Sequence, residues 1–198
     1  MNSTFIIGAG GLGREVAAML LNSDYDKSEL YFIDDNLKKG TQVNGVEVWG
    51  SLTELIAYPN EAQVFLAVGS AEIKKKILKQ LIQDEATAVN PKLSFPNFIH
   101  KSAQLEQREF IKLGKGNIIC QGALMTTNIT LGSFNLVNRY STLSHDTVIG
   151  NNCIIMPGVH ISGGAKVGNY VYIGTGAVIA LSTFIQNNAR IEPGEIVG

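Results

Sequence analysis

The stretch that decides the fold is IGNNCIIMPGVHISGGAKV, residues 149–167, in which an aliphatic residue returns at every sixth position. The same spacing runs unbroken from Leu113 to Val197. An amphipathic helix places apolar residues every three or four positions and a half-buried strand every two, so a period of six fits neither. It predicts a parallel β-helix of hexapeptide repeats. The fifteen members of the series are Leu113, Ile119, Met125, Leu131, Val137, Leu143, Ile149, Ile155, Ile161, Val167, Ile173, Ile179, Ile185, Ile191 and Val197.

A second series supports this prediction, because a mostly small residue stands four places after most of these aliphatics. Both positions must face inward in a narrow three-sided prism. Gly114 recurs as Gly132, Gly150 and Gly168, three hexads apart, and we expect one corner of each coil to need a backbone conformation that only glycine adopts cheaply. Fifteen hexads then make five coils. The small positions are Ala123, Ser141, Thr147, Cys153, Val159, Ala165, Val171, Ala177, Thr183 and Ala189.

The composition is that of a globular protein without a strong charge bias. The 198 residues carry 16 Lys and Arg against 17 Asp and Glu, a balance that disfavours nucleic acid as a partner. No apolar run approaches the roughly eighteen residues of a membrane span, so we expect no membrane insertion. The N-terminus begins as a strand rather than as a secretion leader, and Cys120 and Cys153 read as reduced thiols. We therefore predict a cytoplasmic location.

The first third of the chain predicts a small parallel α/β sheet. Residues 4–7 form a strand that runs into GAGGLG, residues 8–13, and then into an apolar helix. Gly8, Gly10 and Gly13 match the G-x-G-x-x-G spacing, which brings helix-start N–H groups to a phosphate. A second strand over 30–33 ends in two aspartates, where an acidic side chain can bond a ribose or a base.

This pattern predicts a nucleotide site, to which Gly69 at the end of a third strand, 64–68, also contributes. Only about ninety residues precede the prism, enough for half of a dinucleotide fold, so a nucleotide or nucleotide sugar is preferred over NAD. The alternative is that the glycines make a tight turn and bind no ligand. The predicted site residues are Gly8, Gly10, Gly11, Gly13, Asp34, Asp35 and Gly69.

The domain organisation follows from these two patterns. A half-Rossmann α/β domain occupies residues 1–92 and the β-helix occupies residues 97–198. Two prolines, Pro91 and Pro96, mark a linker over 91–98. Within the first domain, a helix is expected over 72–83 and a candidate fourth strand over 86–90.

The combination of GAGGLGREV, residues 8–16, with an uninterrupted hexapeptide prism resembles the NeuD/PglD family of sugar acetyltransferases. The most specific stretch is NRYSTLSHDTVIG, residues 138–150, which is similar to the family segment that contains the catalytic histidine. The resemblance implies a left-handed β-helix that transfers acetyl from acetyl-CoA to an amine or hydroxyl of a sugar. That sugar is commonly nucleotide-linked, in bacterial surface-glycan pathways. It also implies a homotrimer with CoA between the prisms and the sugar held by the front domain.

The resemblance assigns roles to particular residues as well. His145 becomes the catalytic base, and Asn138, from the same stretch, is a candidate for substrate binding. Gly163 and Gly164 would contact the acetyl end of the cofactor, and later coils at Gly174 and Ala180 would carry its pantetheine arm. No metal is expected.

The chemistry of His145 supports this role independently. It stands two places after Leu143, so it projects outward near a corner, and imidazole is the common side chain that can accept a proton near neutral pH. An attacking amine or hydroxyl must lose a proton, and a positioned base contributes ~10²- to 10⁴-fold. Asp146 can orient the ring or stabilise the imidazolium. Since Cys153 should face the interior, away from the histidine, direct transfer in a ternary complex is expected. The alternative is a solvated corner histidine without function.

Three departures from the family pattern bear on the site. Leu12 stands where many relatives carry a histidine that contacts the nucleotide sugar, which alters the contacts expected in the front pocket. Ile154 stands where some relatives carry a second histidine, which removes a candidate hydrogen bond to the acceptor or the thioester. The sequence ends at Gly198, short of the usual tail over the CoA adenine, so we expect modest cofactor affinity.

Competing functions remain open at this stage. A non-catalytic trimeric scaffold that binds nucleotide sugars would use the prism only to oligomerise. A zinc enzyme of the prism type needs a close histidine pair, whereas His145 and His160 are fifteen residues apart and His100 precedes the prism. An NAD-dependent oxidoreductase would bind NADH. The sugar, its nucleotide and the choice between N- and O-acetylation stay undetermined.

Overall fold

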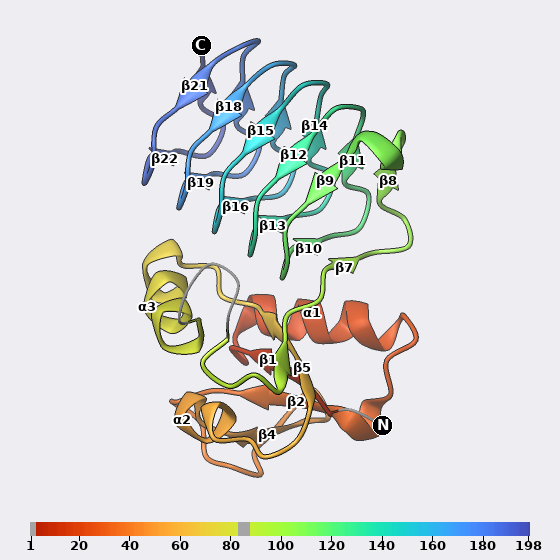
Figure 1. Cartoon of the computed structure of the whole chain (residues 1–198), viewed down its shortest axis with the longest axis vertical. Coiled ribbons are helices and arrows are strands. Elements are labelled where there is room, and N and C mark those ends of the chain that lie inside the picture. Colours follow the sequence, from red (N-terminus) through yellow and green to blue (C-terminus); the bar gives the residue numbers. More distant parts are fainter. Residues whose placement is uncertain (1–2, 83–87) are drawn as a thin grey trace. The chain divides into compact units, whose positions relative to one another are not determined.

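The computed structural model describes residues 3–82 and 88–198 and divides the chain into two compact units, one ending at Pro96 and the next beginning at Asn97 (Figure 1). The front unit is built on a six-stranded sheet of order β3-β4-β2-β1-β5-β6, in which only β3 is antiparallel to its neighbour. Its strands are β1 Ser3–Ile7, β2 Leu30–Ile33, β3 Gln42–Val43, β4 Val46–Gly50, β5 Ala62–Leu66 and β6 Leu93–Ser94. Its helices are α1 Gly11–Leu21, η1 Lys27–Glu29, α2 Leu52–Ile56 and α3 Ala71–Leu81.

The central strand of this sheet explains where the site lies. β1 pairs with β2 on one side and β5 on the other, and its apolar run buries Phe5 and Ile6 completely. Helix α1 buries Val16 and Leu20. Because the three strands are parallel, their carboxyl ends meet at one edge, where α1 and α3 begin; ligands of such sheets bind at that edge.

The structure confirms the strands predicted over 4–7 and 30–33. It places the third strand at Ala62–Leu66 instead of 64–68 and the helix at Ala71–Leu81 instead of 72–83, and it corrects the periphery of the unit. The pair β3–β4 was not predicted. Of the candidate fourth strand, residues 86 and 87 lie outside the described residues, and Ala88 forms an isolated antiparallel bridge with Ile82. The strand beside β5 is β6, so the stretch 91–98, expected as a linker, contains a strand at Leu93–Ser94 and ends on Phe98, a strand residue of the second unit.

The second unit is a left-handed parallel β-helix whose short strands stack into three faces (Figure 1). Face one contains β7 Phe98–Ile99, β10 Ile118–Ile119, β13 Leu136–Val137, β16 Ile154–Ile155, β19 Tyr172–Ile173 and β22 Arg190–Ile191. Face two contains β8 Gln104–Leu105, β11 Leu124–Met125, β14 Thr142–Leu143, β17 His160–Ile161, β20 Val178–Ile179 and β23 Ile196–Val197. Face three contains β9 Lys112–Leu113, β12 Thr130–Leu131, β15 Val148–Ile149, β18 Lys166–Val167 and β21 Phe184–Ile185.

The fifteen predicted aliphatics each occupy the second position of a strand and form the interior, where Ile155 and Ile173 are fully buried. The prism begins earlier than the series does, because β7 and β8 add two strands before Leu113. Partner residues on faces one and two of this first turn are twenty positions apart instead of eighteen. The two extra residues are accommodated around the 3₁₀ turn η2 Arg108–Phe110, which breaks the period, so the sequence pattern did not predict these strands.

The recurring glycines of the prism serve a different purpose from the one expected. None of Gly114, Gly132, Gly150 and Gly168 is among the residues with positive φ. Each lies against the next coil: a Cβ on Gly132 would come within 2.6 Å of the Gly150 carbonyl oxygen, and one on Gly150 within 2.8 Å of that of Gly168. These glycines are therefore required by close stacking, and the expectation of a special backbone conformation was wrong for them.

The left-handed conformation occurs instead at another position of every hexad. One residue in each carries a φ between 54° and 72°. Glycine, Asn and Asp adopt this conformation most cheaply, yet aromatic residues also fill it here. The fourteen positions are Gly116, Gly122, Asn128, Phe134, Tyr140, Asp146, Asn152, Gly158, Gly164, Tyr170, Gly176, Ser182, Asn188 and Gly194.

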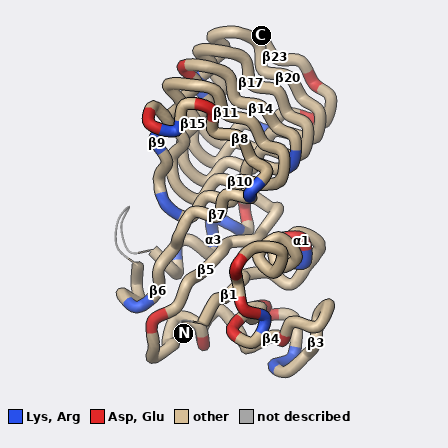
Figure 2. Tube along the Cα trace, turned by 90° about the vertical axis from the view of Figure 1, so that its right-hand side faces the viewer, with Lys and Arg blue, Asp and Glu red and all other residues tan. Residues whose placement is uncertain are grey.

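Charged residues of both signs occur along the trace of each unit (Figure 2). Within residues 3–82 and 88–198, no helix combines the length and apolar character that crossing a membrane requires.

Candidate active site

His145 lies at the corner between faces two and three of the prism. It follows β14, and β15 begins three residues later. Leu143, two places before it, points into the core and is fully buried, so the chain turns outward at His145 and leaves 59% of its side chain exposed. The outward placement predicted from the hexad register is confirmed.

The neighbouring carboxylate is in direct contact with this imidazole. His145 Nδ1 and Asp146 Oδ2 are 2.8 Å apart, although adjacent side chains in a strand would point to opposite faces. The turn makes this possible, because Asp146 has a left-handed backbone with φ 61°. The hydrogen bond with His145 holds the pKa of the Asp146 carboxyl below its usual value. Since Nδ1 is engaged by a carboxylate, Nε2 is the ring nitrogen left to accept a proton.

Gly163, one coil further, packs directly against the imidazole of His145. A Cβ at this position would come within 2.5 Å of both Cε1 and Nε2 of His145. The main chains also join here, since Gly164 N donates to the His145 carbonyl oxygen at 2.8 Å. Both glycines predicted to contact the acetyl end therefore lie beside His145, and Gly163 is needed for the ring to take its place.

The other predicted residues of the prism lie elsewhere. Asn138 is buried, and its side-chain oxygen accepts the N–H of Arg139 at 2.8 Å, so it is not turned outward. A Cβ on Gly174 would come within 2.5 Å of Pro193 N, whereas Ala180 lies after β20 and donates its N–H to the Val197 carbonyl oxygen. Ile154 is completely buried.

The remaining histidines and the cysteines have local contacts. His160 Nδ1 lies 2.9 Å from Thr142 Oγ1 on face two, and His100 Nδ1 lies 2.9 Å from Ser102 Oγ. Cys153 is buried and its thiol donates to the Gly168 carbonyl oxygen at 3.0 Å. Among the described residues, no group of three or more His, Cys, Asp or Glu side chains is placed to hold a metal ion.

The front unit contains a cleft of about 540 Å³ at the carboxyl ends of β1, β2 and β5. The predicted residues that line it are Gly8, Gly10, Gly11, Asp34, Asp35 and Gly69. A Cβ on Gly10 or Gly11 would meet nothing within 4 Å, so the start of α1 is open toward any ligand. The first turn of α1 has neither a side-chain cap nor an acidic residue.

Gly13 does not line this cleft. A Cβ there would lie 1.8 Å from the Gly8 carbonyl oxygen, so this glycine allows the helix to pack on the turn that precedes it. That is the packing role of the third glycine in such motifs.

Both aspartates of the cleft are bonded to the main chain. Asp34 Oδ2 accepts from Ala9 N and Oδ1 from Asn36 N, each at 2.9 Å. Asp35 Oδ1 accepts from Leu52 N, the first residue of α2, at 2.8 Å. These carboxylates therefore stabilise the main chain that forms the walls of the cleft.

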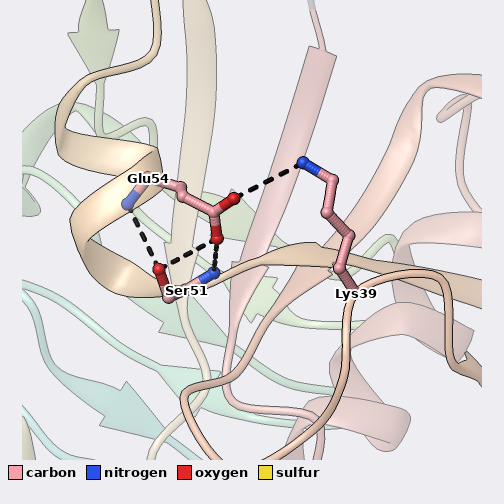
Figure 3. A network of polar contacts seen from close by, with 3 residues as sticks. All are labelled: Lys39, Ser51 and Glu54. Carbon is pink, nitrogen blue, oxygen red and sulfur yellow. Dashed lines mark hydrogen bonds and ion pairs between the residues drawn. The ribbon is translucent and has the colours of Figure 1, made fainter.

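A polar network fixes the start of α2 beside this wall (Figure 3). Ser51 and Glu54 form a reciprocal capping box, in which Glu54 Oε2 accepts from Ser51 N at 2.8 Å. Lys39 Nζ lies 3.5 Å from Glu54 Oε1. Hydrogen bonds from the Ser51 N–H and hydroxyl hold the pKa of Glu54 below its usual value.

Comparison with known proteins agrees with this two-part architecture. Residues 4–81 match the PglD N-terminal domain, and residues 146–180 match the bacterial transferase hexapeptide (six repeats). The GDP-perosamine N-acetyltransferase of Escherichia coli O157:H7 is 30% identical over 186 residues, which cover 90% of this chain and 78% of that protein. The chain belongs to the PglD-like family of hexapeptide sugar acetyltransferases. It is an acyltransferase, as the sequence predicted.

Solved structures of PglD-like acetyltransferases share the fold. The acetyltransferase domain of PglB from Neisseria gonorrhoeae FA1090 superposes with a TM-score of 0.83 at 26% identity, covering 100% of this chain and 92% of that one. The same domain in complex with acetyl coenzyme A gives a TM-score of 0.81 at 26% identity, with coverage of 100% and 93%. Perosamine N-acetyltransferase from Caulobacter crescentus has a TM-score of 0.85 at 23% identity, covering 100% and 89%, and supports the fold.

Several cleft residues of this PglD-like chain were not predicted from its sequence. Asn36, Ser70, Ile73, Lys76, Ile77 and Gln80 line the cleft with the predicted glycines and aspartates. Four of them lie on α3, whose inward face is set by packing, and no local motif marks them. Leu12, singled out as a departure from the family pattern, also lines the cleft.

Proposed function

We propose that the protein transfers the acetyl group of acetyl-CoA to the amine of a nucleotide-linked sugar, with His145 as general base. The observation that carries the proposal is the exposed imidazole resting on Gly163, with Nδ1 held by Asp146 at 2.8 Å. Asp146 in this position favours the tautomer with the proton on Nδ1, which presents Nε2 to an acceptor.

The chemistry balances with these groups alone. The acceptor nitrogen attacks the thioester carbonyl, a C–N bond forms and the C–S bond breaks. Nε2 takes the proton that the nitrogen loses, and the departing thiolate leaves as a thiol once that proton is returned. Asp146 stabilises the imidazolium between the two transfers. Since both cysteines are buried, neither is placed for a covalent acetyl intermediate.

The acceptor class rests on the front cleft and on the relatives. A cleft of about 540 Å³ with an open helix start suits a phosphate-bearing nucleotide. The relative with 30% identity over most of the chain acts on an amino sugar carried by GDP, which supports an amine over a hydroxyl. We assign nucleotide binding to the residues of the cleft and acetyl-CoA binding to the prism, including Gly164, Gly174 and Ala180. Asn138, whose side chain is buried, remains a candidate for substrate binding.

The assembly and setting are part of the same proposal. We infer a homotrimer in which a neighbouring prism completes each corner, because a single corner with 59% of His145 exposed excludes little water. The reaction would take place in the cytoplasm and would serve surface-glycan biosynthesis.

The test is acetyl transfer to a panel of UDP-, dTDP-, GDP- and CMP-linked amino sugars and their hydroxyl counterparts, read as release of free CoA thiol. His145→Ala should reduce turnover at least ~10²-fold, while CoA binding and oligomer size persist. His160→Ala is the matched control, since this histidine lies on face two and bonds Thr142.

Three outcomes would contradict the proposal. Unchanged turnover in His145→Ala would favour the non-catalytic scaffold. Acetylation only of free sugars would remove the nucleotide from the acceptor. Fluorescence quenching on titration with NADH would favour the oxidoreductase.

A further inference from the structure

The cleft of the front unit has two walls that differ in charge. One wall carries the carboxylates of Asp34 and Asp35, which directly follow β2. The other is one face of α3, whose lining residues follow the helical spacing i, i+3, i+4 and i+7. They are Ile73, Lys76, Ile77 and Gln80. Lys76 is the one cation among the described residues that line the cleft, so the acidic groups there outnumber the basic one.

The two helices that begin at this cleft differ in their first turns. Helix α1 begins after Gly10 without a side-chain cap and has no acidic residue in its first turn, so its start is open to a phosphate. The first turn of α3 is already occupied, because the Ser70 hydroxyl accepts from Ile73 N at 3.3 Å and Glu72 lies in the same turn. Helix α3 therefore contributes to anion binding through the Lys76 side chain and not through its N-terminus.

The ammonium of Lys76 is paired with a residue outside the cleft. Lys76 Nζ lies 2.8 Å from Glu72 Oε1, one helical turn earlier, and the two side chains are 70% and 78% exposed. Glu72 is not among the residues that line the cleft. An ion pair between groups this exposed contributes little, because water screens it. The ammonium is carried by a flexible four-carbon stem, so it can exchange Glu72 for a phosphate in the cleft.

We propose that Lys76 makes the cleft select a nucleoside diphosphate: one phosphate lies at the start of α1, and the second replaces Glu72 as the partner of the Lys76 ammonium. A second phosphate adds negative charge to a cleft that already contains two carboxylates, and an ammonium within hydrogen-bond reach offsets that charge. The inference rests on the proposed function and narrows its acceptor to sugars linked through a diphosphate. A CMP-linked sugar, which has a single phosphate, gains nothing from Lys76.

The alternative is that the pair between Lys76 and Glu72 only stabilises α3, as ion pairs one turn apart do in isolated helices. The two roles are distinguished by breaking the pair from either side. Lys76→Met and Glu72→Gln both remove the ion pair, so a structural role predicts the same change for both. The proposed role predicts opposite changes in nucleotide affinity, because Glu72→Gln releases the ammonium toward the cleft.

The experiment is calorimetric titration of the full chain with UDP and UMP, and with GDP and GMP, in buffer without divalent cations so that the protein alone supplies positive charge. Lys76→Met should raise the Kd of the diphosphate by ~10-fold, the effect of one charge-assisted hydrogen bond in a partly exposed site, and that of the monophosphate by ~2-fold or less. Glu72→Gln should lower the Kd of the diphosphate by ~2-fold, because the pair that it removes is weak.

Two further variants serve as controls. Lys79→Met removes the same charge from the same helix at an exposed position outside the cleft, and it should leave the Kd values unchanged. Lys76→Arg keeps the charge and should retain the preference for the diphosphate. Thermal unfolding of all four variants reports separately whether α3 has been destabilised.

The Kd values separate this inference from the proposed function. An equal rise in Kd for the mono- and diphosphate in Lys76→Met would overturn the inference, as would a loss of affinity in Glu72→Gln or Lys79→Met as large as that in Lys76→Met. If the parent protein binds neither class of nucleotide, the inference and the nucleotide part of the proposed function both fail. If it binds diphosphates through Lys76 but transfers no acetyl group, the inference stands and the proposed function fails.

Discussion

The front cleft and the prism corner both carry aspartates beside glycines, but the aspartates are bonded to different groups. In the front unit, Asp34 and Asp35 accept main-chain N–H groups and hold the turns together. At the prism corner, Asp146 accepts from the side chain of His145. In a repeated coil the main-chain groups form hydrogen bonds with the coils above and below. A side chain at a corner is therefore not required to bond the main chain and can interact with another side chain instead. In a single-copy turn, the same residue type must first stabilise the fold.

The largest expected effect is on stability and comes from a charge placed in the buried interior of the prism. Ile155 is fully buried between coils, so Ile155→Asp leaves a charge in the stack and should cost more than ~4 kcal/mol of the free energy of unfolding. Val148→Asp on the outer surface, where the residue is 41% exposed, should cost ~0.5 kcal/mol or less. Urea unfolding followed by circular dichroism gives both values. Similar losses for the two variants would show that the core is not where the hexad places it.

The next effect tests close packing in the front unit. Gly13→Ala places a Cβ 1.8 Å from the Gly8 carbonyl oxygen and should destabilise the protein by ~3 kcal/mol. Gly11→Ala, at a position where a Cβ meets nothing within 4 Å, is the control and should retain stability. Thermal unfolding of both variants decides the question. If Gly11→Ala were the more damaging change, the assignment of Gly13 to packing and of Gly11 to the cleft would be reversed.

A crossed pair of glycine variants probes the prism corner. Gly163→Ala should displace the imidazole and lower kcat by ~10- to 100-fold, because misplacement of a base by about 1 Å is costly. Gly158→Ala has open space around its Cβ but a φ of 68°, so it should lose ~1 kcal/mol of stability and keep its activity. Turnover and unfolding measured on the same preparations distinguish the two. A Gly163→Ala variant with full activity would mean that the ring does not act from its place on the next coil.

The sequence predicted the prism better than the front unit for a physical reason. A hexad repeats its packing requirement fifteen times, so Leu143 alone fixed the direction of His145. The strands β7 and β8 were missed because the period is broken at η2, and the role of the recurring glycines was missed because close stacking between coils leaves no separate mark in the sequence. The front unit has no such redundancy. The cleft residues on α3, and the partners of Asp34 and Asp35, depend on contacts between distant segments that no local pattern encodes. The sequence pointed to Asp146 as the partner of His145, but it did not predict the positive φ, at a residue that is not glycine, that accompanies their contact.

The smallest effect contrasts two carboxyl groups with lowered pKa values. Glu54 is held mainly by the Ser51 N–H and hydroxyl, and Asp146 by His145. A group whose pKa is lower in the folded state than in the unfolded state adds stability above its unfolded pKa, and this stability is lost as the pH falls through the folded pKa. The stability difference between the parent protein and Glu54→Gln should therefore be complete near pH 7 and close as the pH falls below the usual glutamate value of 4.5. The stability difference between the parent protein and Asp146→Asn should close in the same way as the pH falls below the usual aspartate value of 3.8.

Only Asp146→Asn should also lower kcat, because Glu54 caps α2 and Asp146 orients the imidazole. Unfolding measured between pH 3 and 7, together with turnover at pH 7, makes the comparison. If only Glu54→Gln lowered kcat, the catalytic carboxylate would be Glu54 in the front unit, and Asp146 would have only a structural role.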